Sequence, residues 1–313
     1  MIINQPTYED FEILGIQCLY QSFDIIFKVK TTLSEYYEDE VVNEELKEEN
    51  VWEYNRGEIM TSLILLQQGI EALMKSAIAK QSALLLIENS KTDWPTLPES
   101  KNKDFDEFQT ISGEKLLKTY CAIVDTAKVD KDFIKLFEEI RLIRNKFVHS
   151  VSNKVIKFDF VIEKVLESFT FFFGQDKWIE IMRKVYIDNP LLGYYDWDIE
   201  ESLFMNRLDF AKESIGLGKL NKHFSIDIKS RKYYCPKCNN GLHGDFSSEV
   251  DSKWTILSPN TPTSETVKCL ICQGEYSIKR IKCQQDSCKG NAIVNSEEYD
   301  ELCLSCYQMY NDI

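Results

Sequence analysis

Apolar positions recur at helical spacing through the first 175 residues of the chain. In 7–36 they are three or four positions apart, which predicts one long helix. A second helix is expected over 52–89, whose centre, 61-TSLILLQQGIEALMKSAIAK-80, is apolar on most faces and should be buried. Further helices are expected over 112–127, 130–149 and 157–173. Long helices of this kind pack as an antiparallel bundle.

The pattern changes after residue 175. Residues 196–216 predict one more helix, ended by Gly216 and Gly218, and its acidic start suits the positive end of a helix dipole. The segment 224–234 begins with alternating apolar residues, which predicts a short strand, and His223 before it is expected to be exposed. The fold class is therefore mainly α, with a small β region at the C-terminal end.

Charge is distributed unevenly. The net charge is -14, yet the chain from Gly216 onward holds equal numbers of acidic and basic residues, so the helical part carries the excess. A strongly acidic body repels nucleic acid over its general surface, which leaves room only for a local basic site. No apolar run is long enough to cross a bilayer and no secretory signal is apparent, so a cytoplasmic protein with no membrane contact is expected.

Eight of the ten cysteines form four close pairs: 235-CPKC-238, 269-CLIC-272, 283-CQQDSC-288 and 303-CLSC-306. Four thiolates on two such knuckles complete a tetrahedral zinc site and leave no open position for catalysis. We therefore expect two structural zinc ions. Sequential pairing groups the first two pairs and the last two, because neighbours close shorter loops, while a cross-braced pairing remains an alternative. The isolated Cys18 and Cys121 are expected to be buried core thiols.

These patterns divide the chain into three parts: a helical bundle over 1–175, a helical extension over 176–218, and a tandem zinc-ribbon domain over 219–313. Basic and aromatic residues lie close to the cysteine pairs in the sequence: Arg231, Lys232, Tyr233, Tyr234, Lys237, Tyr276, Lys279, Arg280 and Lys282. They would suit a nucleic-acid patch with stacking platforms, or they are ordinary surface residues.

One segment, 141-RLIRNKFVHS-150, carries candidate chemistry at the end of a helix. Residues four apart share a helix face, so Arg141, Asn145 and His149 form a polar stripe with Arg144 on its flank. Arginine can hold a phosphate, and histidine can move a proton near neutral pH. The alternative is a solvated helix end, where His and Arg interact favourably with the helix dipole.

Arg144, Asn145 and His149 together resemble the motif of the HEPN superfamily, an arginine followed by a polar residue and then a histidine near the end of a bundle helix. The helix around Glu71 also looks like the second conserved helix of that family, and the resemblance covers roughly residues 7–175. It implies a HEPN-like helical bundle that acts as a metal-independent endoribonuclease and dimerises. Arg144 would hold the phosphate, His149 would act as acid or base, Asn145 would orient His149 or contact the phosphate, and Glu71 would support the arginine. Arg141 is added from spacing alone.

Two functional hypotheses follow from this resemblance. In the first, the protein cuts tRNA or mRNA by attack of the 2′-hydroxyl, as a toxin or antiviral effector restrained by an antitoxin or a defence-complex partner. In the second, the bundle is a catalytically inactive dimerisation module, and the zinc ribbons act as an adaptor that binds protein or nucleic acid.

Overall fold

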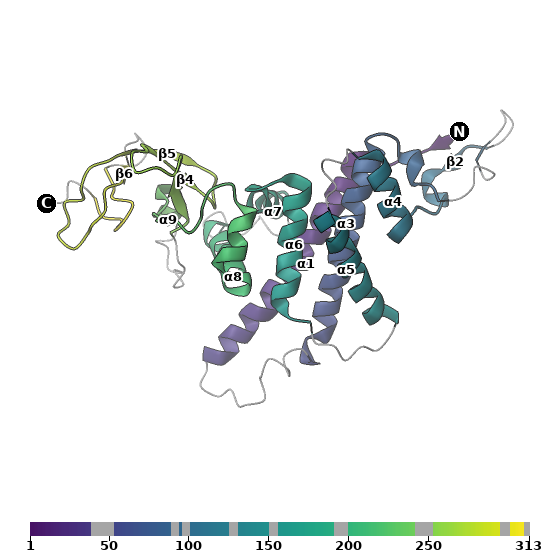
Figure 1. The fold of residues 1–313 in the computed structure, drawn as a ribbon, viewed down its shortest axis with the longest axis horizontal. Helices are drawn as coiled ribbons and strands as arrows, with labels where there is room; N and C mark the ends of the chain where they lie inside the picture. The colour runs from purple at the N-terminus through teal and green to yellow at the C-terminus, as the bar shows by residue number, and fades with distance from the viewer. Residues whose placement is uncertain are drawn as a thin grey trace. The chain divides into compact units, whose positions relative to one another are not determined.

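The computed structural model is mainly helical, with a small antiparallel sheet near the C-terminus. It divides into two compact units, Met1–Phe172 and Phe173–Ile313. The residues described are 1–38, 53–88, 94–95, 101–124, 131–149, 156–190, 200–241, 253–294 and 301–309. Figure 1 traces the chain through both units.

The first unit contains five helices among its described residues. They are α1 (Tyr8–Glu38), α3 (Arg56–Ala79), α4 (Gly113–Ile123), α5 (Lys131–His149) and α6 (Phe158–Phe173), whose last residue belongs to the second unit. Two 3-10 turns and a two-stranded parallel sheet complete the unit: η2 (Ala83–Leu86), η4 (Phe105–Glu107), β1 (Ile2–Ile3) and β2 (Lys103–Asp104).

Small residues allow α1 and α3 to pack closely. A Cβ atom added to Gly69 would lie 2.9 Å from Cδ2 of Leu19 and 3.0 Å from the carbonyl oxygen of Gly15. Further along the same interface, the hydroxyls of Ser22 and Ser62 lie 3.0 Å apart, and each donates to the other residue's carbonyl oxygen. The two contacts run in opposite chain directions, so the helices are antiparallel.

Aromatic side chains join α4, α5 and α6. The ring of Phe133 on α5 stacks on Phe171 of α6, with centroids 3.8 Å apart and planes 9° apart. Tyr120 of α4 approaches the same ring at 5.7 Å. Aromatic residues of the helix predicted over 157–173 therefore pack between the helices.

The predicted second helix was too long. It ends at Ala79, and Ser82 then takes an extended conformation whose side chain accepts a hydrogen bond from the amide of Leu84. This cap starts the separate turn η2, although apolar residues continue in the sequence.

The second unit begins with two longer helices, α7 (Lys177–Ile187) and α8 (Glu200–Leu220), followed by the turn η5 (Asn221–His223). Gly216 interrupts α8 with a positive φ of 78°, at the position where the sequence predicted the helix to end. Helix α7 was not predicted, although its buried residues Trp178, Ile179, Met182 and Tyr186 recur at helical spacing.

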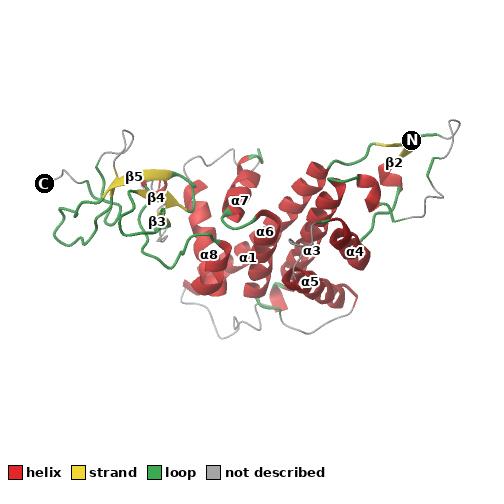
Figure 2. Cartoon of the chain, turned by 45° about the horizontal axis from the view of Figure 1, so that its top comes forward, coloured by secondary structure: helices red, strands yellow, loops and turns green. Residues whose placement is uncertain are grey.

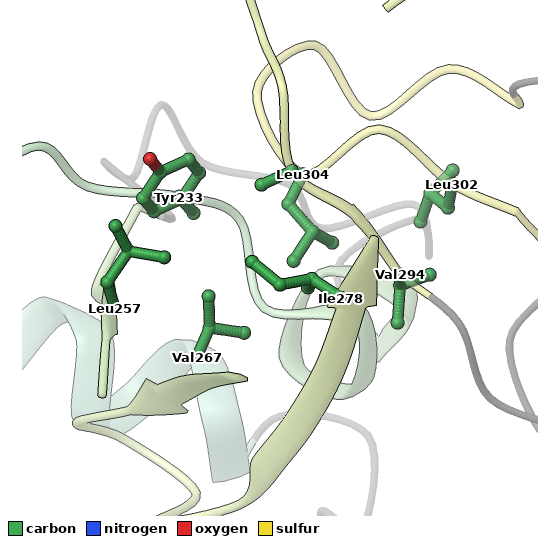
Figure 3. Packing of buried hydrophobic residues seen from close by; sticks show 8 residues of the cluster. Tyr233, Leu257, Val267, Ile278, Val294, Leu302 and Leu304 are labelled. Atoms are coloured by element: carbon green, nitrogen blue, oxygen red, sulfur yellow. The ribbon is translucent and has the colours of Figure 1, made fainter. Parts of the chain in front are cut away.

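A four-stranded antiparallel sheet follows the short helix α9 (Pro236–Gly241). Its strands lie in chain order: β3 (Thr255–Leu257), β4 (Thr266–Cys269), β5 (Glu275–Lys279) and β6 (Ile293–Val294). Figure 2 shows β3, β4 and β5 in the C-terminal part of the chain. The strands contribute to a hydrophobic core, which Figure 3 shows. It is formed by Tyr233, Leu257, Val267, Ile278, Ala292, Val294, Leu302 and Leu304.

The strand predicted over 224–234 is wrong. The backbone there is bound by side chains instead: the amide of Ser225 donates to Asp176 Oδ1, and the amide of Ile228 donates to Asn221 Oδ1. Only Tyr233 forms a bridge, with Thr255. His223 is also buried, contrary to its expected exposure. The alternating apolar residues fill a core but do not pair as a strand.

No helix in the described part of the chain has both the length and the apolarity that a membrane span requires. The helical extension predicted over 176–218 lies in the same compact unit as the cysteine pairs, because the chain divides between Phe172 and Phe173.

Candidate metal centres and candidate active site

The first cysteine cluster unites Cys235, Cys238, Cys269 and Cys272, whose sulfur atoms all lie within 4.8 Å of one another. The Sγ atoms of Cys235 and Cys272 are 3.6 Å apart, and those of Cys238 and Cys269 are 3.8 Å apart. Sulfurs about 2.3 Å from a tetrahedral zinc ion would be separated by roughly 3.8 Å. The cluster is therefore compatible with one structural metal ion.

Hydrogen-bond donors surround the sulfurs of this cluster. The amide of Ile271 donates to Cys269 Sγ at 3.3 Å, and that of Gly274 donates to Cys272 Sγ at 3.4 Å. The hydroxyl of Tyr276 also lies 3.4 Å from Cys272 Sγ. Burial raises the pKa of Cys269, whereas hydrogen bonds from the other three thiols lower the pKa of Cys272. A cation would stabilise all four groups as thiolates.

The second cluster unites Cys283, Cys288, Cys303 and Cys306. Here the Sγ atoms of Cys283 and Cys306 are 3.8 Å apart, and those of Cys288 and Cys303 are 3.9 Å apart. The predicted sequential pairing is the one observed, and the cross-braced alternative is wrong. Burial raises the pKa of Cys306 to about 12, so without a cation this thiol is protonated at neutral pH.

Helices α7 and α8 attach to the first cluster through Arg183. Its Nε donates to Glu200 Oε1 at 2.7 Å, and its Nη1 donates to the carbonyl oxygen of Ile271 at 2.8 Å, between Cys269 and Cys272. Burial alone would lower the pKa of Arg183, but the hydrogen bond and charge of Glu200 raise it. The acidic start of α8 therefore binds cationic side chains of its own unit, including Lys237, 3.6 Å from Glu201.

The aromatic residues predicted as stacking platforms are engaged within the unit. Tyr233 is buried in the sheet core, and Tyr276 contacts Cys272. Lys253 lies over the ring of Tyr234 at 4.5 Å. Among the basic residues, Lys279 pairs with Glu301 at 2.7 Å. These contacts favour the alternative that the residues serve the fold of the unit itself.

The Arg144 motif lies on α5 in the first unit. Nη1 of Arg144 donates to Oδ1 of Asn145 at 2.9 Å. Nε of Arg144 is buried and has no hydrogen-bond partner among the described residues, although the side chain as a whole is half-buried. His149 is the last residue of α5, and its side chain lies outside the description. The structure therefore brings Arg144 and Asn145 together and places His149 just over one helical turn beyond them.

Arg141, predicted from spacing, pairs with Glu138 on the same helix. Its Nη2 and Nε both donate to Glu138 Oε2, at 2.7 Å and 3.1 Å. The side chain is only partly exposed and its charge is balanced locally. Arg141 is therefore less suited than Arg144 to receive a phosphate.

Glu71 is buried on α3, which packs against α5, but its hydrogen-bond partner is not the arginine of the motif. It accepts a hydrogen bond from Gln67 Nε2 at 2.9 Å, and in the described part of the chain no ion pair joins it to Arg144. Burial lowers the pKa of nearby Lys75, an effect that Glu71 opposes. The predicted support of Arg144 by Glu71 is not seen in this arrangement.

A pocket of about 330 Å³, which the sequence did not predict, lies between α5 and the start of α6. Its lining is acidic with an apolar part: Glu139, Ile143, Ile156, Lys157, Asp159, Phe160 and Glu163. Glu139 and Ile143 lie on the opposite side of α5 from Arg141 and Asn145, because positions two apart on a helix diverge by about 200°. The pocket and the polar stripe are therefore separate features.

The two isolated cysteines are only partly buried, contrary to the expectation of buried core thiols. Burial nevertheless raises the pKa of Cys18, so its thiol is protonated at neutral pH.

Comparison with known protein families, with curated proteins and with solved structures found no match for this chain.

Proposed function

We propose that the first unit is a metal-independent endoribonuclease of the HEPN type. The observation that supports it best is the state of Arg144, whose guanidinium is fixed by Asn145 while its Nε stays buried without a partner among the described residues. An unpaired buried donor costs free energy, and the half-buried side chain leaves other guanidinium donors to bind an anionic phosphate oxygen. His149 follows on the same helix and supplies an imidazole, which can accept and donate a proton.

In the proposed reaction, His149 accepts the proton of a ribose 2′-hydroxyl, whose oxygen then attacks the adjacent phosphorus. A phosphorus–oxygen bond forms, and the bond to the 5′-oxygen breaks. Protonation of that oxygen leaves a 2′,3′-cyclic phosphate and a 5′-hydroxyl. Arg144 stabilises the charge that develops on the phosphoryl oxygens, and Asn145 orients Arg144.

A homodimer would place two copies of the motif in one cleft. The outer face of α5 supports this proposal, because Leu142 is 53% exposed and Ile134 is 38% exposed beside the polar stripe. A second copy would cover these apolar side chains. The RNA is proposed to be tRNA or mRNA, and such a nuclease fits a toxin or defence effector held in check by a partner protein.

We propose zinc as the ion of both cysteine clusters, with a structural role. Four sulfur ligands suit tetrahedral zinc and leave no position for a water or a substrate. The metal would hold the sheet and knuckles together, while catalysis in the first unit proceeds without it.

The test is cleavage of total RNA and tRNA by the purified chain during a brief incubation with EDTA that preserves structural zinc. We expect cleavage with cyclic-phosphate ends, and its loss in Arg144→Ala and His149→Ala. Lys135→Ala is the matched control, because Lys135 is an exposed residue of the same helix. Equal cleavage by all four proteins would contradict the assignment of the site.

The second candidate is an inactive helical module with a zinc-containing adaptor. Its support is the internal pairing of the cations near the clusters, such as Lys279 with Glu301 and Lys237 with Glu201. A folded, dimeric wild-type chain that cuts no RNA, with or without extract from infected cells, would favour this adaptor.

A further inference from the structure

We propose that the second cysteine cluster is an oxidation-sensitive metal switch, whereas the first cluster loses its ion more slowly. The two clusters use the same four donors but differ in their surroundings. This inference rests on metal occupancy of the clusters and is independent of the ribonuclease proposal.

The first cluster is shielded by apolar residues. The two residues inside its 269–272 knuckle, Leu270 and Ile271, are 1% and 0% exposed. Arg183 binds the carbonyl oxygen of Ile271, and the buried Trp254 accepts a backbone hydrogen bond at its carbonyl from the amide of Leu270. A solution oxidant reaches this cluster only through Cys272, which is partly exposed.

The second cluster has two buried ligands, Cys283 and Cys303, but is more accessible than the first. Two of its ligands, Cys288 and Cys306, are partly exposed, on opposite knuckles. The loop between Cys283 and Cys288 is polar, and Gln284, Asp286 and Ser287 in it are exposed. No helix follows α9 in the described part of the chain. Exposure of thiolates is what makes metal–sulfur centres react with peroxides.

The spacing of the sulfurs permits a disulfide after oxidation. The thiolate of Cys306 would attack hydrogen peroxide, forming a sulfur–oxygen bond and breaking the oxygen–oxygen bond, to give, with one proton, a sulfenic acid and water. Cys283, whose Sγ lies 3.8 Å from that of Cys306, would then displace the oxygen as hydroxide and form the disulfide. Two thiolates lose two electrons, peroxide with two protons becomes two waters, and the metal ion is released to solution.

Release of this ion would be transmitted to the sheet. The 303–306 knuckle follows Leu302 and contains Leu304, both buried in the sheet core beside Val294 (Figure 3). Tyr307, which follows the knuckle, donates from its hydroxyl to the carbonyl oxygen of Pro236 at 2.9 Å, inside the first knuckle. Loosening of the second cluster would therefore uncover apolar core residues of the sheet.

The experiment uses the full chain loaded with zinc, whose metal content is measured first. Hydrogen peroxide is then added with a chromogenic zinc chelator. We expect one of the two zinc equivalents to leave about tenfold faster than the other. Partial oxidation followed by alkylation and mass spectrometry should find Cys283–Cys306 or Cys288–Cys303 disulfides, while the first cluster remains alkylable.

Matched variants show which cluster loses its zinc ion in the fast phase of release and which in the slow phase. Cys306→Ser should abolish the fast phase, and Cys272→Ser should keep it, since each removes the partly exposed ligand of one cluster. If a variant fails to fold, the alkylation map of the wild-type chain decides alone. Release of both ions at one rate, or first oxidation within 235–272, would overturn the switch. Absence of bound zinc at the outset would overturn the metal assignment as well.

Discussion

Nη1 of Arg183 donates to the carbonyl oxygen of Ile271 at 2.8 Å, joining helix α7 to the knuckle of the first cysteine cluster. The same guanidinium binds Glu200 at the start of α8. One side chain thus fixes two helices and a metal-binding turn, which makes the helices of the second unit part of the same folded structure as the cluster.

Replacement of Arg183 by Met should destabilise the second unit by about 2–4 kcal/mol, because it leaves the largely buried carboxylate of Glu200 and the carbonyl of Ile271 without a donor. Urea unfolding followed by circular dichroism would measure this. Lys177→Met is the control, since its pair with Glu180 is exposed and should contribute little. Equal effects of both substitutions would show that Arg183 has no special role.

Gly69→Ala should destabilise the first unit by about 1–3 kcal/mol, because its Cβ would approach Leu19 and the Gly15 carbonyl oxygen too closely. Gly57→Ala lies on the same helix with nothing within 4 Å of the added atom, so it should be neutral or slightly stabilising. Thermal unfolding of the two variants gives the comparison. A stable Gly69→Ala protein would mean that the helices can separate at little cost.

Arg144→Lys should lower RNA cleavage by about 100-fold or more, since an ammonium cannot give the paired, planar donors of a guanidinium. Asn145→Ala should lower it less, by roughly tenfold, because it removes the group that orients Arg144 but leaves the charge. Initial rates on a defined RNA measure both. Full activity of Arg144→Lys would argue against direct phosphate binding by this residue.

Tyr276→Phe should weaken zinc binding about 10–100-fold, because the lost hydroxyl lies 3.4 Å from Cys272 Sγ. Competition with a zinc chelator would show the weaker binding for only one of the two zinc ions. Tyr54→Phe, at a site 72% exposed in the first unit, is the control. A shift in neither equivalent would show that the hydroxyl does not tune this cluster.

Zinc should leave as the pH is lowered from neutral, because protons compete with the ion for the thiolates. Without the ion, burial holds the pKa of Cys306 at about 12, so a protonated thiol is the stable form across the neutral range. We expect loss of sheet signal and of zinc to coincide during acidification or prolonged chelation. Sheet structure that persists after complete metal removal would contradict a structural role.

Features that depend on local periodicity could be predicted from the sequence. The apolar repeat of residues 7–36 predicted α1 with nearly correct bounds. The cysteine spacing predicted which four cysteines form each cluster. These signals are local, since helix periodicity and knuckle spacing need no knowledge of distant partners.

Other features depended on tertiary contacts. Helix α7 has only eleven residues and begins after Asp176 in a left-handed conformation, so its four buried residues formed too weak a pattern. The segment after His223 alternates like a strand, yet Asp176 and Asn221 bind its backbone amides and prevent pairing. The pocket beside Ile143 likewise requires α6 to approach α5, which no repeat in the sequence encodes.

The close packing of α1 on α3 has a consequence for assembly. Gly15 and Ser22 are seven positions apart, as are Ser62 and Gly69, so the alignment of the two helices is specified within the helices themselves. The polypeptide that links the two helices raises the effective concentration of each helix for the other, but it is not needed to set their alignment. A split protein, with the first helix supplied as a separate chain, should therefore reassemble with the native alignment.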